Sequence, residues 1–319
     1  MIDSVKLHLD VAECGGKDLM GTASLLPDCH PTIDEVTGER KFSGHLGNLR
    51  VWGNSGSVNV EGSIARFYLG NNAHIPTRHD IEEAITLLSD KLELPMGKAD
   101  VWRLDVSYHW IMNRAISEYL QRLNSLRYFA RKQVTPSSLY FDKGGATNAK
   151  NTTNTLLFYN KSKQLHDTHS ETPDAYDDAR LLRYECRWLK RLPKQFGVNT
   201  LTAATLYERP FYCDMVKRWG QYYFAIQKSR ETALEFEGVS TPKQGREWIL
   251  GYCLNRLPAQ EIENILQTMR ERGIYTDAKY YSRLKSELTK CRLQVKQDIG
   301  EDIMTELDNN VRNVLIYCR

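Results

Sequence analysis

The sequence predicts an α+β fold, in which an antiparallel sheet carrying helices is followed by a helical C-terminal region. Apolar residues alternate with polar ones in several short segments of the first 195 residues. After Pro193 the apolar spacing becomes helical and stays so. Mixed elements followed by helices alone are typical of an α+β arrangement. We therefore expect a core over residues 1–195 and a helical accessory region over residues 196–319.

The first region contains most of the strand patterns. At the N-terminus, Val5, Leu7 and Leu9 alternate with polar residues, which indicates a half-buried strand. Further strands are expected at 49–52, 57–61 with a continuation through 64–68, 101–110, 138–141 and 155–159, and helices at 77–92 and 115–129. The segment 181–189 fits a helix or a strand; as a strand it places Arg183, Glu185 and Arg187 on one face.

The second region reads as a series of helices. They are expected at 201–208, 215–228, 243–255, 259–272 and 277–297. No internal repeat or low-complexity tract interrupts them.

Composition excludes several classes of protein. The 319 residues carry a formal net charge of +3, so global charge does not indicate nucleic-acid binding. The seven cysteines form no Cys-X-X-Cys pair, which favours reduced thiols. We see no signal peptide and no apolar run of the ~18 residues that a membrane span needs, so we expect a cytoplasmic protein without membrane partners. A P-loop, a nucleophile elbow and a zincin motif are also missing.

Local charge is more informative than the total. Between Arg180 and Arg230, eleven Lys and Arg residues stand against three acidic ones, and aromatic residues interleave with them. Cations for phosphates and rings for bases are typical of a single-strand DNA channel. The candidate DNA-binding residues in this stretch are Arg183, Arg187, Lys190 and Arg191. An amphipathic helix with its rings in the core explains the same pattern.

Two carboxylates lie inside apolar strand patterns, where a charge needs compensation. Asp105 follows Arg103-Leu104, and Glu185 follows Arg183-Tyr184. Hard oxygen ligands of this kind recruit Mg²⁺ or Mn²⁺. Glu61 and His109 are further candidate ligands. Ion pairs with Arg103, Arg183 or Arg187 are the structural alternative.

A tyrosine and a lysine end another strand pattern. Tyr159 and Lys161 are two positions apart, so a strand places them on one face. A phenolate can attack a phosphodiester, and a nearby lysine lowers the phenol's pKa or stabilises the developing charge. Ordinary packing of a tyrosine at a strand end is the alternative.

The order of these motifs resembles the gene II/X family of phage and plasmid replication initiators, which includes the gene II proteins of filamentous phages. The resemblance covers residues 1 to about 230 and rests on short motifs in sequence. They are Met1 to Leu7, Val60-Glu61, Arg103-Leu104-Asp105, Thr155 to Lys161, and Arg183-Tyr184-Glu185-Cys186-Arg187 followed by Lys194-Gln195-Phe196-Gly197.

The resemblance implies a rolling-circle initiator. Such proteins nick one strand of supercoiled origin DNA, stay joined to its 5′ phosphate through tyrosine, and later rejoin the displaced single strand. It assigns the nucleophile to Tyr159 beside Lys161 and metal-binding carboxylates to Asp105, Glu185 and Glu61. Plasmid initiators that carry the tyrosine beside the glutamate favour Tyr184 instead.

The fold implied is distantly like the HUH endonucleases, a nickase core, although this chain lacks their paired histidines. The expected partners are origin DNA in a bacterial cytoplasm, with a host helicase and polymerase. The helical region after residue 195 is a candidate DNA-binding or helicase-recruiting part. Two alternatives remain: a non-catalytic DNA-binding replication or copy-control protein of the same fold, and a metal nuclease that uses water.

Overall fold

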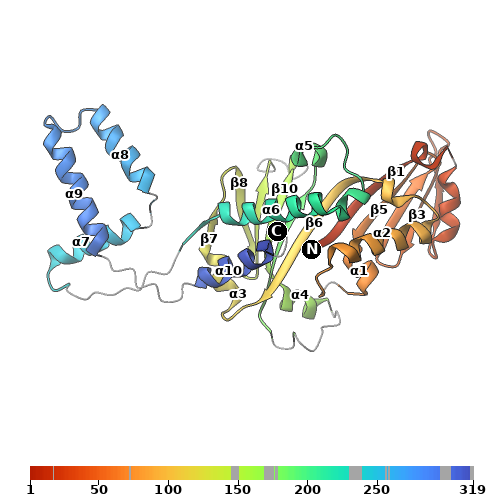
Figure 1. Cartoon of the computed structure of the whole chain (residues 1–319), viewed down its shortest axis with the longest axis horizontal. Coiled ribbons are helices and arrows are strands. Elements are labelled where there is room, and N and C mark those ends of the chain that lie inside the picture. Colours follow the sequence, from red (N-terminus) through yellow and green to blue (C-terminus); the bar gives the residue numbers. More distant parts are fainter. Residues whose placement is uncertain are drawn as a thin grey trace. The chain divides into compact units, whose positions relative to one another are not determined.

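The computed structural model confirms an α+β protein with a large antiparallel sheet and a helical C-terminal part (Figure 1). The structure describes residues 1–16, 18–71, 73–144, 151–168, 176, 179–229, 239–255, 257, 259–294 and 303–316. Within these residues no helix is both long and apolar enough to cross a membrane.

Ten strands form one sheet, in the spatial order β2-β3-β4-β5-β1-β6-β11-β10-β9-β8, and every neighbouring pair is antiparallel. Their bounds are β1 Ile2–Asp10, β2 His30–Ile33, β3 Arg40–Leu46, β4 Leu49–Asn54, β5 Ser57–Ser63, β6 Asp100–Ile111, β8 Phe129–Thr135, β9 Ser138–Lys143, β10 Asn154–Asn160 and β11 Leu181–Trp188. The short strands β7 (Leu123–Ser125) and β12 (Gln227–Lys228) pair separately.

The helices follow or separate these strands. They are α1 Ile64–Leu69, α2 Arg78–Leu92, α3 Ile116–Arg122, α4 Lys161–Asp167, α5 Leu192–Phe196, α6 Arg209–Ala225, α7 Pro242–Asn255, α8 Ala259–Glu271, α9 Ala278–Gln294 and α10 Ile303–Ile316. Short 3₁₀ turns lie at Val11–Cys14, Leu19–Leu25, Met96–Lys98 and Ala204–Tyr207.

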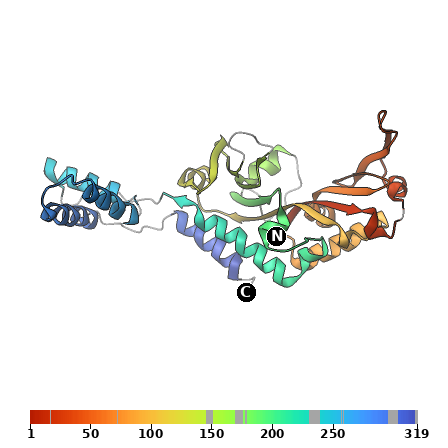
Figure 2. The same cartoon turned by 90° about the horizontal axis from the view of Figure 1, so that it is seen from above.

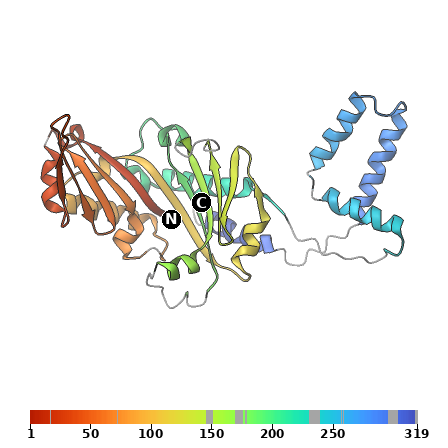
Figure 3. The same ribbon diagram turned by 180° about the vertical axis from the view of Figure 1, so that it is seen from behind.

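Helices α2, α6 and α10 lie along the same side of the sheet (Figure 2). The contact with α6 is aromatic: Trp219 packs against Tyr184, with ring centroids 4.8 Å apart, and against Trp110. Phe158 stacks on the other side of Tyr184 at 4.4 Å. Seen from behind, the strands lie in front of α6 and α10 (Figure 3). The sheet therefore has a helix-covered face, which holds the core, and a second face available for polar residues.

Most elements predicted in the first region are confirmed. The strands at 5–10, 49–52, 57–61, 101–110, 138–141 and 155–159 form, and those at 49–52 and 57–61 pair with each other as β4 and β5. Segment 181–189 is a strand, which settles the ambiguity in its pattern. The helix expected at 77–92 is α2, and a capping box between Thr77 and Asp80 fixes its first turn.

Two predictions in this region are wrong. Residues 64–68 do not continue β5 but form α1, because the Ser63 side chain accepts a hydrogen bond from the Arg66 amide and caps a helix there. The helix expected at 115–129 stops at Arg122, and the chain then enters β7 and β8. Strands β2, β3 and β8 and helices α4, α5 and α10 were not predicted.

The chain divides into two compact units, residues 1–228 with 306–319, and residues 229–305. In the second unit, α7 and α9 are joined where the Arg292 guanidinium donates to the Asn255 side chain. The first unit includes α6, which packs on the sheet, and α10, which is hydrogen-bonded to α6 through Asp308 and Tyr223. The predicted division into a core over residues 1–195 and an accessory region over residues 196–319 stays a prediction.

Helix α10 joins the first unit through a buried carboxylate. Asp308 accepts hydrogen bonds from the Tyr223 hydroxyl at 2.7 Å and from the Lys228 ammonium at 3.0 Å. The neighbouring Tyr119 hydroxyl donates to Glu306 of the same helix.

We expect Asp308→Ala to lower the free energy of unfolding by about 3–5 kcal/mol, since it removes one member of a buried ion pair. Asp214→Ala is the matched control because its ion pair with Arg218 is solvent-exposed and contributes at most about 1 kcal/mol. Urea unfolding followed by tryptophan fluorescence measures both changes. Equal losses in the two variants would contradict this account of α10.

Candidate functional site

The second face of the sheet carries a group of charged residues, here called the charge cluster: Asp3, Arg103, Asp105, Arg183, Glu185 and Arg187. Strand pairing sets their positions, because residues directly opposite in antiparallel strands share a face. Arg187 lies opposite Asp105, and Arg183 lies opposite Tyr159. Glu185 is therefore a diagonal neighbour of both Asp105 and Tyr159, at about 7–8 Å between backbones. The structure thus places Glu185 beside both residues, whereas Asp105 and Tyr159 lie two strands and four residues apart on that face, roughly 16 Å between backbones.

Guanidinium groups surround both carboxylates. Arg103 donates to both Asp105 oxygens, at 3.0 and 2.6 Å. The Arg187 Nε lies 2.6 Å from Glu185 and 3.8 Å from Asp105, so one arginine bridges the two acids. On the other side, Arg183 pairs with Asp3 at 3.0 Å and lies 3.8 Å from Glu185. In the described residues both acids form ion pairs with arginines, which was the alternative to metal binding.

Asp105 is nonetheless an electrostatically costly residue. Burial raises the pKa of Asp105 to about 6; Arg103 lowers it, and the nearby Glu185 raises it again. Because the folded protein binds this proton more tightly than the unfolded chain, the resulting stability is present below pH 3.8 and is lost as the pH rises through about 6. Two carboxylates that repel each other at neutral pH are a favourable place for a cation.

Tyr159 stands at the edge of the charge cluster. Its side chain is half-buried, and its hydroxyl makes no hydrogen bond to any residue in the described part of the chain. Burial raises the pKa of Tyr159 above the ordinary value for a tyrosine, and the guanidinium of Arg183 opposes this shift. The phenol is therefore protonated at rest, and positive charge lies beside it.

Lys161 begins α4 directly after this strand and is fully buried. Its ammonium donates to the Gln164 side chain at 2.7 Å. Burial lowers the pKa of Lys161 to about 7, and Arg183 lowers it further, while Asp3 and Glu185 oppose the shift. A lysine with this pKa exchanges its proton near neutral pH.

Tyr184, predicted as the alternative nucleophile, does not belong to the cluster. Its side chain is fully buried on the helix-covered face, where the hydroxyl donates to the Trp219 carbonyl at 3.1 Å. Burial raises the pKa of Tyr184 well above its usual value. The reason is the period of the strand: Tyr184 lies between Arg183 and Glu185, and adjacent residues point to opposite faces.

The four predicted metal ligands are not gathered at one point. Glu61 lies two strands from Asp105 and accepts a hydrogen bond from Arg103 at 3.1 Å. His109 is four residues along β6 from Asp105, about 13 Å away, and its Nε2 lies 3.2 Å from the Tyr176 hydroxyl. Burial lowers the pKa of His109 to about 3, and Arg183 adds to this effect.

Of the four predicted metal ligands, Asp105 and Glu185 are the two that lie beside each other, with Arg187 bridging them. Among the described residues, no three His, Cys, Asp or Glu side chains form a cluster that could hold a metal ion. Mg²⁺ is commonly held by one or two carboxylates, with water and substrate phosphate supplying the other ligands. Two buried and mutually repelling carboxylates fit that donor set, provided that Arg187 leaves the position between them.

The predicted DNA-binding residues separate into two groups. Arg183 is buried in the charge cluster, and Arg187 is engaged with Glu185. Lys190 and Arg191 lie in the turn before α5, and both are exposed. Most aromatic residues of the 180–230 stretch pack α5 and α6 onto the sheet and are buried, among them Trp188, Trp219 and Tyr223. For this stretch the buried rings agree with the amphipathic-helix interpretation, and the single-strand channel stays a prediction.

Asp3 is a member of the cluster that the sequence pattern did not predict. It lies on β1, where the pairing with β6 shifts register between Ile2 and Ser4. This bulge allows Asp3 to reach Arg183 and to accept from Ser63 at 3.0 Å. The only available signal was an acid next to buried Ile2 in the opening motif.

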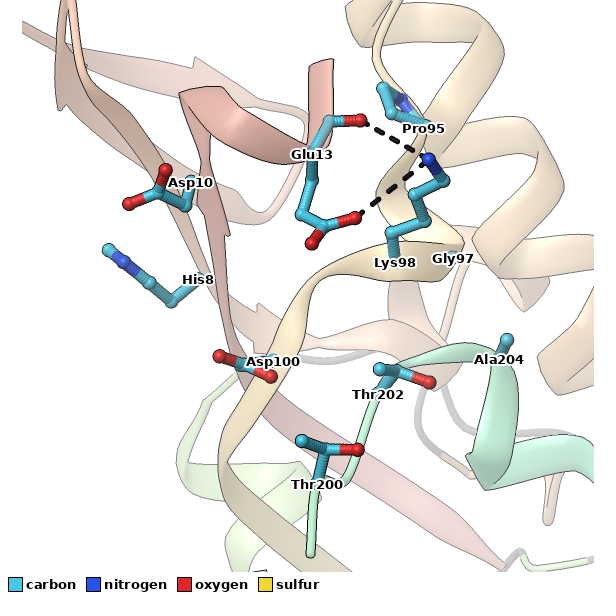
Figure 4. A pocket seen from close by; sticks show the side chains of 10 residues that line it. All are labelled: His8, Asp10, Glu13, Pro95, Gly97, Lys98, Asp100, Thr200, Thr202 and Ala204. Carbon is cyan, nitrogen blue, oxygen red and sulfur yellow. Dashed lines mark hydrogen bonds and ion pairs between the residues drawn. The ribbon is translucent and has the colours of Figure 1, made fainter. Parts of the chain in front are cut away.

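A cavity of about 590 Å³ opens elsewhere and contains no member of the charge cluster (Figure 4). His8, Asp10, Glu13 and Asp100 line it, and Lys98 donates to the Glu13 carbonyl at 3.3 Å. This cavity therefore does not represent the site that contains Tyr159.

Comparisons with known proteins agree with the motifs. No curated protein matches the chain. Among solved structures, the di-domain ARO/CYC BexL from the BE-7585A biosynthetic pathway aligns with 72% of this chain and 100% of its own, at 10% identity and a TM-score of 0.22, a value too low to indicate a shared fold. The family model for the N-terminal part of the gene II replication-associated protein of phages matches residues 1–208. This match spans the sheet and the charge cluster, and the chain therefore belongs to that family of gene II-like phage replication initiators.

Proposed function

We propose that this initiator nicks and rejoins DNA and that Tyr159 is its nucleophile. The observation that carries the proposal is the position of the Tyr159 hydroxyl. It shares a sheet face with Asp105 and Glu185, lies beside Arg183, and has no hydrogen bond within the described residues. The proposed core is distantly like that of the HUH endonucleases, with carboxylates in place of paired histidines.

In the proposed reaction the phenolic oxygen of Tyr159 attacks the scissile phosphorus, and the bond from phosphorus to the 3′ oxygen breaks. The 3′ oxygen takes up a proton and leaves as a hydroxyl, while the 5′ phosphate stays esterified to Tyr159. Neutral Lys161, next to the charge cluster, accepts the phenolic proton. The reverse reaction with another 3′ hydroxyl rejoins the strand without a nucleoside triphosphate.

The arginines and carboxylates have separate proposed roles. Arg183 stabilises negative charge on the Tyr159 oxygen. Asp105 and Glu185 would hold Mg²⁺ or Mn²⁺, which supplies charge neutralisation at the phosphate oxygens when bound. Arg187, released from the acids, is positioned to contact the same phosphate.

A second candidate function is a non-catalytic DNA-binding replication protein of this fold. The ion pairs favour it, because the charge cluster is balanced without any ligand. In that case Tyr159 is a packing residue.

Tyr159→Phe is expected to abolish an SDS-stable protein–DNA adduct formed with an origin oligonucleotide and Mn²⁺. Tyr184→Phe is the control, because its hydroxyl lies on the other face and its loss leaves the adduct intact. Gel electrophoresis of labelled DNA measures the adduct. Cleavage without an adduct would indicate a water-using nuclease, and neither product would favour the non-catalytic function.

Adduct formation is expected to fall as the pH decreases through about 6, because the Asp105 carboxyl then binds a proton and loses its affinity for a cation. Asp105→Asn should be inactive at every pH, as should the wild-type protein after removal of metal with EDTA. Asp34→Asn, remote in the turn before β3, is the control. Full activity in EDTA would exclude the metal role.

The adduct rate is also expected to rise as the pH increases through about 7, because Lys161 then loses its proton and can accept one. Lys161→Met keeps the length of the side chain but should remove this step and leave only the step near pH 6. Single-turnover rates across the range from weakly acidic to weakly basic pH measure both. An unchanged profile in Lys161→Met would show that another group takes the proton.

A further inference from the structure

The same sheet face carries a second group of residues, here called the tryptophan platform: Lys6, His8, Arg50, Trp52 and Trp102. They come from the neighbouring strands β1, β4 and β6, with β5 between β4 and β1. His8 lies across from Asn59, which lies across from Trp52, so these side chains share a face.

A β-bulge explains why Trp102 points away from the core. Lys6 pairs with Arg103 and Leu7 pairs with Val101, so Trp102 is an extra residue in β6 without an opposite partner. A bulge of this kind re-aims a side chain. Trp102 is 45% exposed as a result, which is unusual for an indole in the middle of a sheet.

The rings and cations of the platform contact one another. The His8 ring stacks on Trp102, with centroids 4.0 Å apart and planes at 16°. The Lys6 ammonium lies 5.2 Å from the Trp52 ring and 5.9 Å from the Trp102 ring, and the Arg50 guanidinium lies 5.0 Å from Trp52. The platform is therefore a preformed aromatic surface with positive charge at its centre.

The positive charges of the platform are not balanced by nearby carboxylates. Neither Lys6 nor Arg50 forms an ion pair with any carboxylate in the described residues. Glu61 lies across from both in the strand register, but Arg103 binds it. The exposed Trp102 ring, the half-buried Trp52 ring and cations without a carboxylate partner suit a ligand that presents flat faces and negative charges alternately.

The platform is continuous with the charge cluster. Arg103 joins them, since it contacts Glu61 on one side and Asp105 on the other. Strand spacings place Trp102 roughly 25 Å from Tyr159 on the same face. A single strand of several nucleotides spans this distance.

We propose that the tryptophan platform binds single-stranded DNA, with bases stacked on Trp102 and Trp52 and phosphates contacted by Lys6 and Arg50. Stacking on aromatic rings beside cations is how proteins hold unpaired strands without reading their sequence. The proposal rests on the proposed function in that the bound strand is the one cut at Tyr159.

Trp102→Ala tests the platform in the non-cleaving Tyr159→Phe background, where binding is separated from chemistry. We expect its affinity for a fluorescein-labelled single-stranded 20-mer, measured by anisotropy, to fall about tenfold or more. Phe224→Ala is the matched control. Phe224 is also an exposed ring beside cations, Lys228 and Arg312, but it belongs to α6 on the other side of the sheet. The affinity of the Phe224→Ala variant for the 20-mer should not change.

Lys6→Met and Arg50→Met provide an independent readout. Each should reduce the slope of log affinity against log salt by about 0.7, the value for one contact to a single-strand phosphate, whereas Trp102→Ala should leave the slope unchanged. Unaltered affinity in Trp102→Ala, or no binding of the 20-mer by the parent protein, would overturn the proposal.

The adduct assay keeps the two proposals distinguishable. Trp102→Ala with intact Tyr159 should still form the adduct at saturating oligonucleotide, since the platform binds the strand but does not react. Loss of binding in Trp102→Ala together with no adduct in any variant would support the platform and reject the nucleophile.

Discussion

The charge balance of one sheet face is the constraint on which the rest of the structure depends. Asp3, Asp105 and Glu185 are almost completely removed from water, and so is Arg183. Each of these charges is tolerable only while its partner on the next strand is present. Strands β1, β6 and β11 must therefore pair in a single register. A slip of one residue in β11 would turn Arg183 and Glu185 into the aromatic core and Tyr184 into the charge cluster.

Much of the charge cluster was readable from the sequence, because the period of a strand is strict. In each Arg-X-acid motif the strand period predicted that the arginine and the acid, Asp105 or Glu185, lie on the same face of the strand. The order of the motifs identified the family. What the sequence could not reveal was the partner of each charge. Asp3 enters the cluster through a bulge near Ile2, and such irregularities leave no pattern in the apolar spacing.

The same limit applies to two groups of aromatic residues. Aromatic residues between 180 and 230 have helical spacing with interleaved cations, which fits a binding surface or a packed helix equally well. In the structure these rings pack against one another and against Trp110 and Phe158 of the sheet. Conversely, strict alternation assigns Trp102 to the face of Leu104, in the core. The β-bulge in β6 turns Trp102 to the opposite, solvent-exposed face. The alternation of apolar and polar residues therefore could not predict that Trp102 belongs to the proposed binding surface.

The ion pair between Lys228 and Asp308 has a topological consequence. These residues are 80 positions apart and mark where the chain leaves the first compact unit and where it returns. The ion pair therefore holds together the two points at which the chain leaves and re-enters the first unit. The entropic cost of closing the loop between them is offset by contacts within the first unit. Insertions or deletions between the two residues change the size of the loop and leave its anchorage untouched. Changes in the intervening helices therefore leave the sheet and its charge cluster in place.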